Sequence, residues 1–117
     1  MTHSMPTDTD IFEGLRQELR RGSLILAVLG SLRAEHYGYT LRKALAEVGV
    51  EIEEGALYPM LRRLEAQGLL TSQWREEQKR NKRFYRLSDQ GRAVLALLTT
   101  EWRALGGAVD NILKGEG

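Results

Sequence analysis

Apolar residues recur at steps of three and four through the first third of the chain, a spacing that predicts helices. Residues 11–21 have one apolar face and follow capping candidates at residues 8–10. Residues 23–32 are apolar on nearly every side, which is typical of a central core helix. Because Gly22 lies between the two segments, we expect a break there and two helices rather than one.

Two shorter amphipathic helices are predicted next. They cover about residues 39–48 and 54–67, and each is followed by a glycine that suits a C-cap. Pro59 has no amide hydrogen to donate, so regular hydrogen bonding in the second of these helices should begin close to residue 55 or 56.

An antiparallel hairpin follows, because residues 69–75 and 82–87 have the pattern of strands and the charged residues 76–81 separate them. The net charge of the chain is only +1, but residues 75–86 hold six basic side chains against two acidic ones. Three compact helices followed by a basic hairpin is the order of a winged helix-turn-helix module. In such a module one helix enters the major groove and the hairpin reaches along the phosphates.

The last predicted helix begins at the N-cap pair Ser88 and Asp89 and extends to about Lys114. Its apolar residues form a near-heptad seam, which a helix needs in order to pack along a partner helix. A body of this size cannot bury so long a seam, so the pattern predicts a homodimer. Gly106 and Gly107 either permit close backbone approach or mark a bend. The seam consists of Val94, Leu98, Trp102, Leu105, Val109 and Ile112.

Composition narrows the class of protein. Of the 117 residues, 42% are hydrophobic and 28% charged, as in an ordinary globular domain. There is no cysteine, and His3 and His36 are the only histidines, so we expect no disulfide, no metal site and no cofactor. No nucleophile, base and orienting group occur at motif spacing, which argues against an enzyme. The longest apolar run, residues 24–30, is too short to cross a bilayer, so a cytoplasmic protein without a membrane partner is expected.

Together these elements predict an α-rich, α+β fold: a winged helix-turn-helix with an N-terminal helix and a long C-terminal dimerisation helix. The winged domain covers residues 11–87, with its wing at 69–87, and the dimerisation helix covers 88–114. Residues 1–10 are expected to form a disordered N-terminus.

Three runs of residues carry a family resemblance: Gly38-Tyr39-x-Leu41, then Gly55-Ala56-Leu57-Tyr58-Pro59-x-Leu61-x-x-Leu64-Glu65-x-x-Gly68-Leu69-Leu70, then Arg83-Phe84-Tyr85-x-Leu87-Ser88-x-x-Gly91. The pattern resembles the PadR family of transcriptional regulators over about residues 11–113, and the single C-terminal helix is similar to the family's smaller subgroup. The resemblance implies a dimeric DNA-binding repressor whose C-terminal and N-terminal helices build the dimer interface. Ala56 stands where the family often has threonine or serine, which would remove one hydroxyl contact to the DNA backbone.

The basic wing is the first candidate for DNA contact. Arg80 and Lys82 would bind phosphates or enter the minor groove, with Arg83 in support, although charge runs are more often simply solvated turns. Such contacts position a protein on DNA and need not read sequence.

The preceding helices supply the other candidates. The resemblance favours contact of Tyr58 with a phosphate or a base edge over core packing. Arg62 would read guanine from the major groove, although one of the two arginines Arg62 and Arg63 could equally pair with Glu65 or Glu54. Tyr39 would bind a phosphate or cap the core. The predicted DNA-contacting residues are Tyr39, Ala56, Tyr58, Arg62, Arg63, Arg80, Lys82 and Arg83.

Trp102 lies on the predicted dimer seam, where its ring would meet its symmetry mate. Packing is the simpler interpretation. Some members similar to the short subgroup stack flat hydrophobic ligands on a tryptophan at this place, so the resemblance offers a small aromatic effector as a second hypothesis. The predicted effector and dimer residues are Leu15, Leu98, Trp102, Leu105 and Val109.

The functional prediction is a sequence-specific regulator of transcription. It would bind a roughly palindromic operator in double-stranded DNA as a homodimer, repress transcription, and be released by a small aromatic or hydrophobic effector. The alternative is a winged-helix scaffold for protein interaction without specific DNA binding.

Overall fold

The N-terminal part of the chain forms one long helix. A computed structural model describes residues 5–115, in which α1 (Asp8–Ser31) continues through Gly22 without interruption. The predicted break is therefore wrong. A glycine inside a helix costs about 1 kcal/mol relative to alanine, and the intact turns on either side outweigh that cost.

A capping box begins α1 at Thr7. The Thr7 hydroxyl accepts the Asp10 amide at 3.0 Å, and the Asp10 carboxylate accepts the Thr7 amide at 3.2 Å. Residues 8–10 are thus helical, and the prediction of disorder over residues 1–10 is wrong for them. Residues 1–4 of that predicted segment lie outside the described residues.

Two short helices follow as predicted, α2 (Gly38–Glu47) and α3 (Glu54–Ala66). The chain leaves them through Gly49 and Gly68, whose φ angles of 87° and 85° lie in the left-handed region that favours glycine. Pro59 lies inside α3, downstream of the first helical amide bonds to the carbonyl of residue 53. Pro59 is thus past the first turn, and its missing donor leaves the Gly55 carbonyl without its regular helical partner.

The hairpin is longer and its turn tighter than predicted. β1 (Leu70–Glu77) pairs antiparallel with β2 (Arg80–Leu87) along its whole length. The turn is reduced to Gln78 and Lys79, both with positive φ (54° and 64°), as in a type I′ turn. The six-residue turn predicted at 76–81 is wrong, because the backbone pairing of the strands continues through Glu76 with Asn81 and Glu77 with Arg80.

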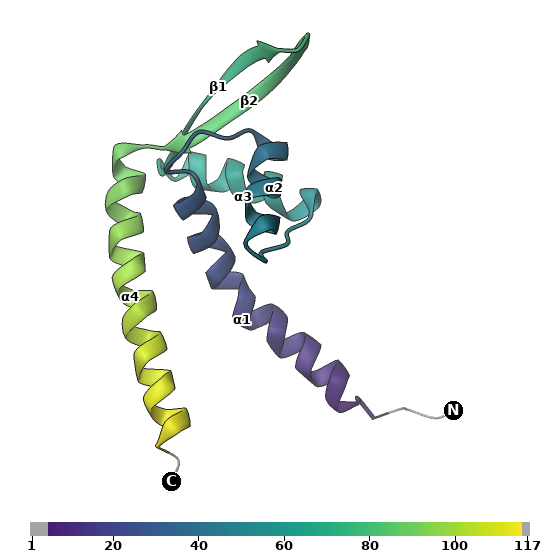
Figure 1. Ribbon diagram of the computed structural model, residues 1–117, viewed down its shortest axis with the longest axis vertical. Helices are drawn as coiled ribbons and strands as arrows, with labels where there is room; N and C mark the ends of the chain where they lie inside the picture. The colour runs from purple at the N-terminus through teal and green to yellow at the C-terminus, as the bar shows by residue number, and fades with distance from the viewer. Residues whose placement is uncertain (1–4, 116–117) are drawn as a thin grey trace.

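One apolar core joins α1, α2, α3 and the base of the hairpin. Figure 1 shows α2 and α3 packed beside the C-terminal end of α1, with the hairpin projecting beyond them. The core is leucine-rich and consists of Val28, Leu29, Leu32, Leu41, Leu45, Leu57, Leu61, Leu64, Leu70, Tyr85 and Leu87. These side chains hold the wing base and α3 in one rigid body.

A backbone bridge attaches the wing to the connection between α1 and α2. The His36 amide donates to the Tyr85 carbonyl at 3.1 Å, and the Tyr85 amide donates to the His36 carbonyl at 2.8 Å. The Leu87 amide donates to the Leu32 carbonyl at 2.9 Å. The base of the hairpin therefore has a third backbone partner, which fixes the direction in which the wing projects.

The last helix is the predicted C-terminal arm, α4 (Asp89–Lys114), capped by the hydroxyl of Ser88. In Figure 1, α1 and α4 diverge from the domain as two arms. Both arms leave large apolar side chains exposed: Ile11, Phe12, Leu15, Leu19, Leu97, Leu98, Trp102, Leu105, Val109, Ile112 and Leu113. α4 is continuous through Gly106 and Gly107, and an added Cβ at either would meet nothing within 4 Å in the described chain.

No helix within residues 5–115 has the length and apolar character needed to cross a bilayer.

Candidate nucleic-acid interface

A groove of about 350 Å³ separates α3 from the wing. Aromatic rings and cations line it together, which is the mixture that suits a phosphate-bearing polymer. The lining residues are Tyr37, Gly38, Tyr58, Arg62, Trp74, Asn81, Lys82, Arg83 and Tyr85. The structure thus brings four of the predicted DNA-contacting residues, Tyr58, Arg62, Lys82 and Arg83, to one hollow.

Tyr58 packs on the start of α2 and also faces the groove. A Cβ added at Gly38 would overlap the Tyr58 phenol ring and hydroxyl, so α2 and α3 approach this closely only with glycine at position 38. The Tyr58 side chain remains 37% exposed. The two interpretations of this tyrosine, packing and contact, are therefore compatible: the ring packs on α2 while the phenol lines the groove.

Arg62 is exposed and forms no ion pair with a carboxylate of the described chain. Both acidic partners considered for it are engaged elsewhere, because Glu65 binds Arg83 and Glu54 binds Arg42. The alternative in which Arg62 is neutralised within the protein is therefore wrong. Arg63, the next residue, is also exposed but does not line the groove.

Arg83 links the wing to α3. Its Nη2 lies 2.9 Å from Glu65 Oε1, and its Nε donates to the Ser72 hydroxyl at 2.9 Å. The same hydroxyl donates to Glu65 Oε2 at 2.6 Å, which closes the cycle. Beside this cluster, burial raises the pKa of the Tyr85 phenol above its usual range, an effect opposed by the Arg83 charge. Two of the three guanidinium nitrogens of Arg83, Nε and Nη2, have partners within the protein, so its geometry favours positioning the wing.

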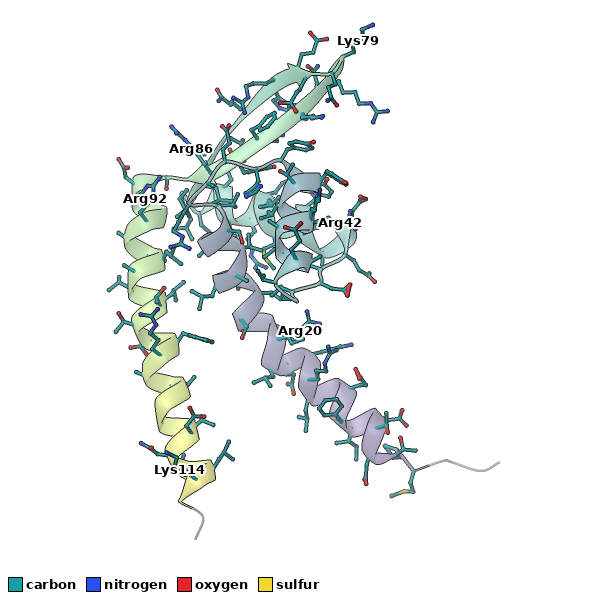
Figure 2. All side chains as sticks on the ribbon, in the orientation of Figure 1. Arg20, Arg42, Lys79, Arg86, Arg92 and Lys114 are labelled. Atoms are coloured by element: carbon teal, nitrogen blue, oxygen red, sulfur yellow. The ribbon has the colours of Figure 1, made fainter. Side chains whose placement is uncertain are left out.

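Lys82 has a similar internal role. Its ammonium lies 4.4 Å from the centroid of the Tyr37 ring, donates to the Tyr37 hydroxyl at 3.3 Å and lies 3.5 Å from Glu77 Oε1. The Lys82 side chain is only 16% exposed. Arg80 and Lys79, by contrast, are exposed at the tip and have no ion-pair partner among residues 5–115; Figure 2 shows Lys79 at the far end of the hairpin.

A second contact holds the opposite side of the wing. Arg75 Nη2 lies 2.5 Å from Glu35 Oε1, and its guanidinium covers the Phe84 ring at 3.8 Å. Sequence inspection missed Glu35, Arg75 and Tyr37 as wing supports. Their charge and aromatic character show only that they can form such contacts. Their partners cannot be identified from the sequence, because they are about 40 or more positions away.

Four predicted residues lie outside the groove: Arg63, Arg80 at the tip of the wing, Tyr39 and Ala56. Tyr39 is 60% exposed at the start of α2 and stacks on Tyr37, with ring centroids 6.4 Å apart. Ala56 borders a separate hollow with Arg20, Arg42 and Glu54 near the start of α3. The structure therefore divides the predicted contact residues between the wing groove, the wing tip and exposed positions on α2 and α3.

A different, apolar hollow lies between α1 and α4. It has a volume of about 310 Å³ and is lined by Gly22, Ile25, Leu26, Leu98, Glu101, Trp102 and Leu105. Trp102 is 56% exposed in this chain. Leu15 and Val109, predicted to belong to the same surface, lie on exposed parts of α1 and α4 outside the hollow.

The order and geometry of these elements match one family. The model of the PadR-like transcriptional regulator family matches residues 25–97, which covers α2, α3, the wing and the start of α4. The chain belongs to the PadR-like family. The family comprises transcriptional regulators, not enzymes, and its members bind DNA.

Individual PadR relatives extend the match beyond the family model. A transcriptional regulator of Mycobacterium tuberculosis is 37% identical over 101 residues, covering 86% of this chain and 92% of the relative. The crystal structure of a PadR family regulator from Eggerthella lenta is 42% identical, with a TM-score of 0.86, and covers 92% of this chain and 96% of that one. A PadR-like regulator from Bacillus cereus is 26% identical, with a TM-score of 0.76, over 85% and 99% of the two chains.

These PadR structures confirm the fold predicted from the sequence: helices, a two-stranded antiparallel wing and a long C-terminal helix.

Proposed function

We propose that this PadR-family protein is a homodimeric repressor that binds a roughly palindromic operator through α3 and the wing. The observation that carries the proposal is the uneven pairing of charges around the groove. Of the acidic residues of the wing and the adjoining side of α3, Glu65 and Glu77 have a basic partner and Glu76 has none, whereas Arg62, Lys79 and Arg80 all lack an acidic partner in the described chain. Unpaired cations on one surface favour contact with phosphates, because each neutralised phosphate releases a condensed counterion.

Dimerisation is proposed from the two arms. The exposed apolar side chains of α1 and α4 form a larger surface than a monomer normally leaves in water. A two-fold pairing of these arms would present two copies of α3 to one face of DNA. Half-sites about 34 Å apart, one turn of the duplex, would then match the two recognition helices.

An effector is proposed for the hollow beside Trp102. Its volume of about 310 Å³ lies at the lower end of the range for small-molecule sites, and its walls are apolar except for Glu101. A small aromatic or hydrophobic compound would suit this lining. The bound compound would favour one arrangement of α1 and α4. If the two copies of α3 in that arrangement no longer match the spacing of the half-sites, the operator is released.

Selection of genomic fragments with the purified protein tests the proposal. An enriched palindrome, bound more tightly than a scrambled duplex and with a steep salt dependence, is the expected result. Repression is then tested with a reporter gene placed behind the selected operator. No enrichment, together with salt-independent capture of an acidic protein, would favour the scaffold function instead.

A further inference from the structure

A second hollow, on the other side of α4, carries three arginines without ion-pair partners. It has a volume of about 410 Å³ and lies where the end of α1, the end of β2 and the start of α4 meet. Figure 2 shows Arg92 near the start of α4, at the end where the hairpin joins the helix. The lining residues are Arg33, Leu87, Arg92, Leu95, Ala96, Thr99, Thr100 and Arg103.

The three guanidinium groups are available to an anion. Arg33, Arg92 and Arg103 are exposed, and none is within ion-pair distance of a carboxylate in residues 5–115. Arg33 uses only its Nε, which donates to the Gly30 carbonyl at 2.8 Å, so its two terminal nitrogens remain free. The hydroxyl of Thr99 donates to a backbone carbonyl of α4, and the anion would therefore be held by the arginines.

The floor of this hollow is apolar. Leu87 is buried, Leu95 is half-buried and Ala96 lies between the arginines. Such a floor gives no advantage to a bare phosphate or to the backbone of a duplex, which is a broad polar surface. It suits the apolar body of a small organic molecule, and the volume lies within the usual range for such ligands.

Except for Leu95, seven residues before Trp102, the hollow uses a different side of α4 from the one assigned to the dimer. Residues 92, 96, 99 and 103 follow one another at steps of four, three and four, and so do residues 98, 102, 105 and 109. At 3.6 residues per turn the two stripes are roughly 120° apart around the helix. The arginine-lined side is therefore separate from the Trp102 surface.

We propose that this hollow binds an amphipathic organic anion, a carboxylate or phosphate monoester with an apolar body, and that the bound anion sets the angle between α4 and the winged domain. The anion would connect Arg33, just after α1, to Arg92 and Arg103 of α4. The regulatory half of this inference rests on the proposed operator binding, but the binding half does not.

Binding is tested first on the protein without DNA. Octanoate, hexyl phosphate, uncharged octanamide and inorganic phosphate are titrated while the methyl resonances of Leu87, Leu95 and Thr99 are followed. Saturable shifts with octanoate or hexyl phosphate are expected, and the tighter of the two identifies the preferred head group. Equal shifts with octanamide, or with inorganic phosphate alone, would overturn the proposal.

Variants then locate the site. Replacing two arginines, Arg92→Gln with Arg103→Gln, should weaken binding of the preferred anion about tenfold or more, because charge-assisted hydrogen bonds are lost. The matched control Arg21→Gln, an exposed arginine of α1 that does not line this hollow, should change it less than about twofold. Unaltered binding in the double variant would overturn the assignment, since the ligand would then occupy another surface.

The last measurement concerns regulation. The preferred anion, at saturation, should change the operator affinity of the wild type and leave that of the double variant unchanged. If the double variant instead binds DNA more weakly without any anion and with a shallower salt slope, the arginines contact DNA and the proposal is wrong. If no duplex is bound by any form, operator binding fails while the methyl shifts still decide the anion site.

Discussion

The guanidinium of Arg83 on β2 lies 2.9 Å from the carboxylate of Glu65 on α3, so a charge that the sequence offers to DNA is used to join the wing to α3. Both side chains are about one third exposed or less, and the Ser72 hydroxyl bridges them. The position of the wing relative to α3 therefore depends on an internal contact. Of the cations predicted to bind DNA from the wing, only Arg80 is both exposed and unpaired in the described chain.

Removing the acidic partner distinguishes positioning from direct contact. We expect Glu65→Ala to weaken operator binding several-fold, because the wing loses its attachment to α3. Loss of the negative charge alone would have the opposite effect and strengthen DNA binding. Its effect on stability should be small, about 1 kcal/mol, as for other partly exposed ion pairs. Fluorescence anisotropy with the selected operator measures the affinity, and tighter binding by Glu65→Ala would contradict the positioning role.

The tip of the wing should dominate the salt dependence. In a dimer, Arg80→Ala removes two side chains, so the slope of log K against log salt should fall by about 1.8, since each phosphate contact contributes about 0.9. The matched control is Arg21→Ala, an exposed arginine of α1 outside the wing groove. An equal change of slope in both variants would exclude a specific role for the tip.

Gly38 and Tyr58 should be coupled. Gly38→Ala places a Cβ against the Tyr58 phenol, and we expect a loss of about 1–3 kcal/mol in the free energy of unfolding. Adding Tyr58→Leu removes the overlap, so the double variant should be more stable than the sum of the single effects predicts. Denaturant unfolding of all three variants measures this coupling.

The control for this cycle is Gly55→Ala on α3, where an added Cβ meets nothing within 4 Å. It should leave the stability unchanged or raise it by up to about 1 kcal/mol. Additive effects of the two substitutions in the Gly38 and Tyr58 cycle would show that the close approach of α2 to α3 has little energetic importance.

Trp102 and Val109 should separate ligand binding from dimerisation. Both lie on the exposed apolar side of α4, but only Trp102 lines the hollow beside α1. We expect Val109→Asp to weaken the dimer, because it places a charge in the apolar seam. Trp102→Ala should lower the affinity for a flat aromatic probe such as acridine about tenfold while the dimer persists. Sedimentation and calorimetry measure the two properties, and a monomeric Trp102→Ala protein would favour plain packing.

Local signals in the sequence were sufficient for the elements and for the family. The helical spacing, the glycines at positions 49 and 68 and the alternation along the strands predicted α2, α3, β2 and α4 to within about two residues. The motif from Gly55 to Leu70 was sufficient for the PadR resemblance, which the family match confirms. These features depend on neighbours close in sequence, and they can therefore be read from the chain itself.

The tertiary structure decided which side chains are free to act. Gly22 was predicted to break a helix, and residues 76–81 to form a broad turn, because local propensity does not include the stability of the turns and strand pairs on either side. The ion pairs could not be predicted from the sequence either, because Glu65 and Arg83 are 18 positions apart and Glu35 and Arg75 are 40 apart. The sequence by itself determined that the wing is basic. Folding decided which of its cations form ion pairs within the protein. The partners of these cations are distant in sequence, and only the packing of the helices and the hairpin brings them close together.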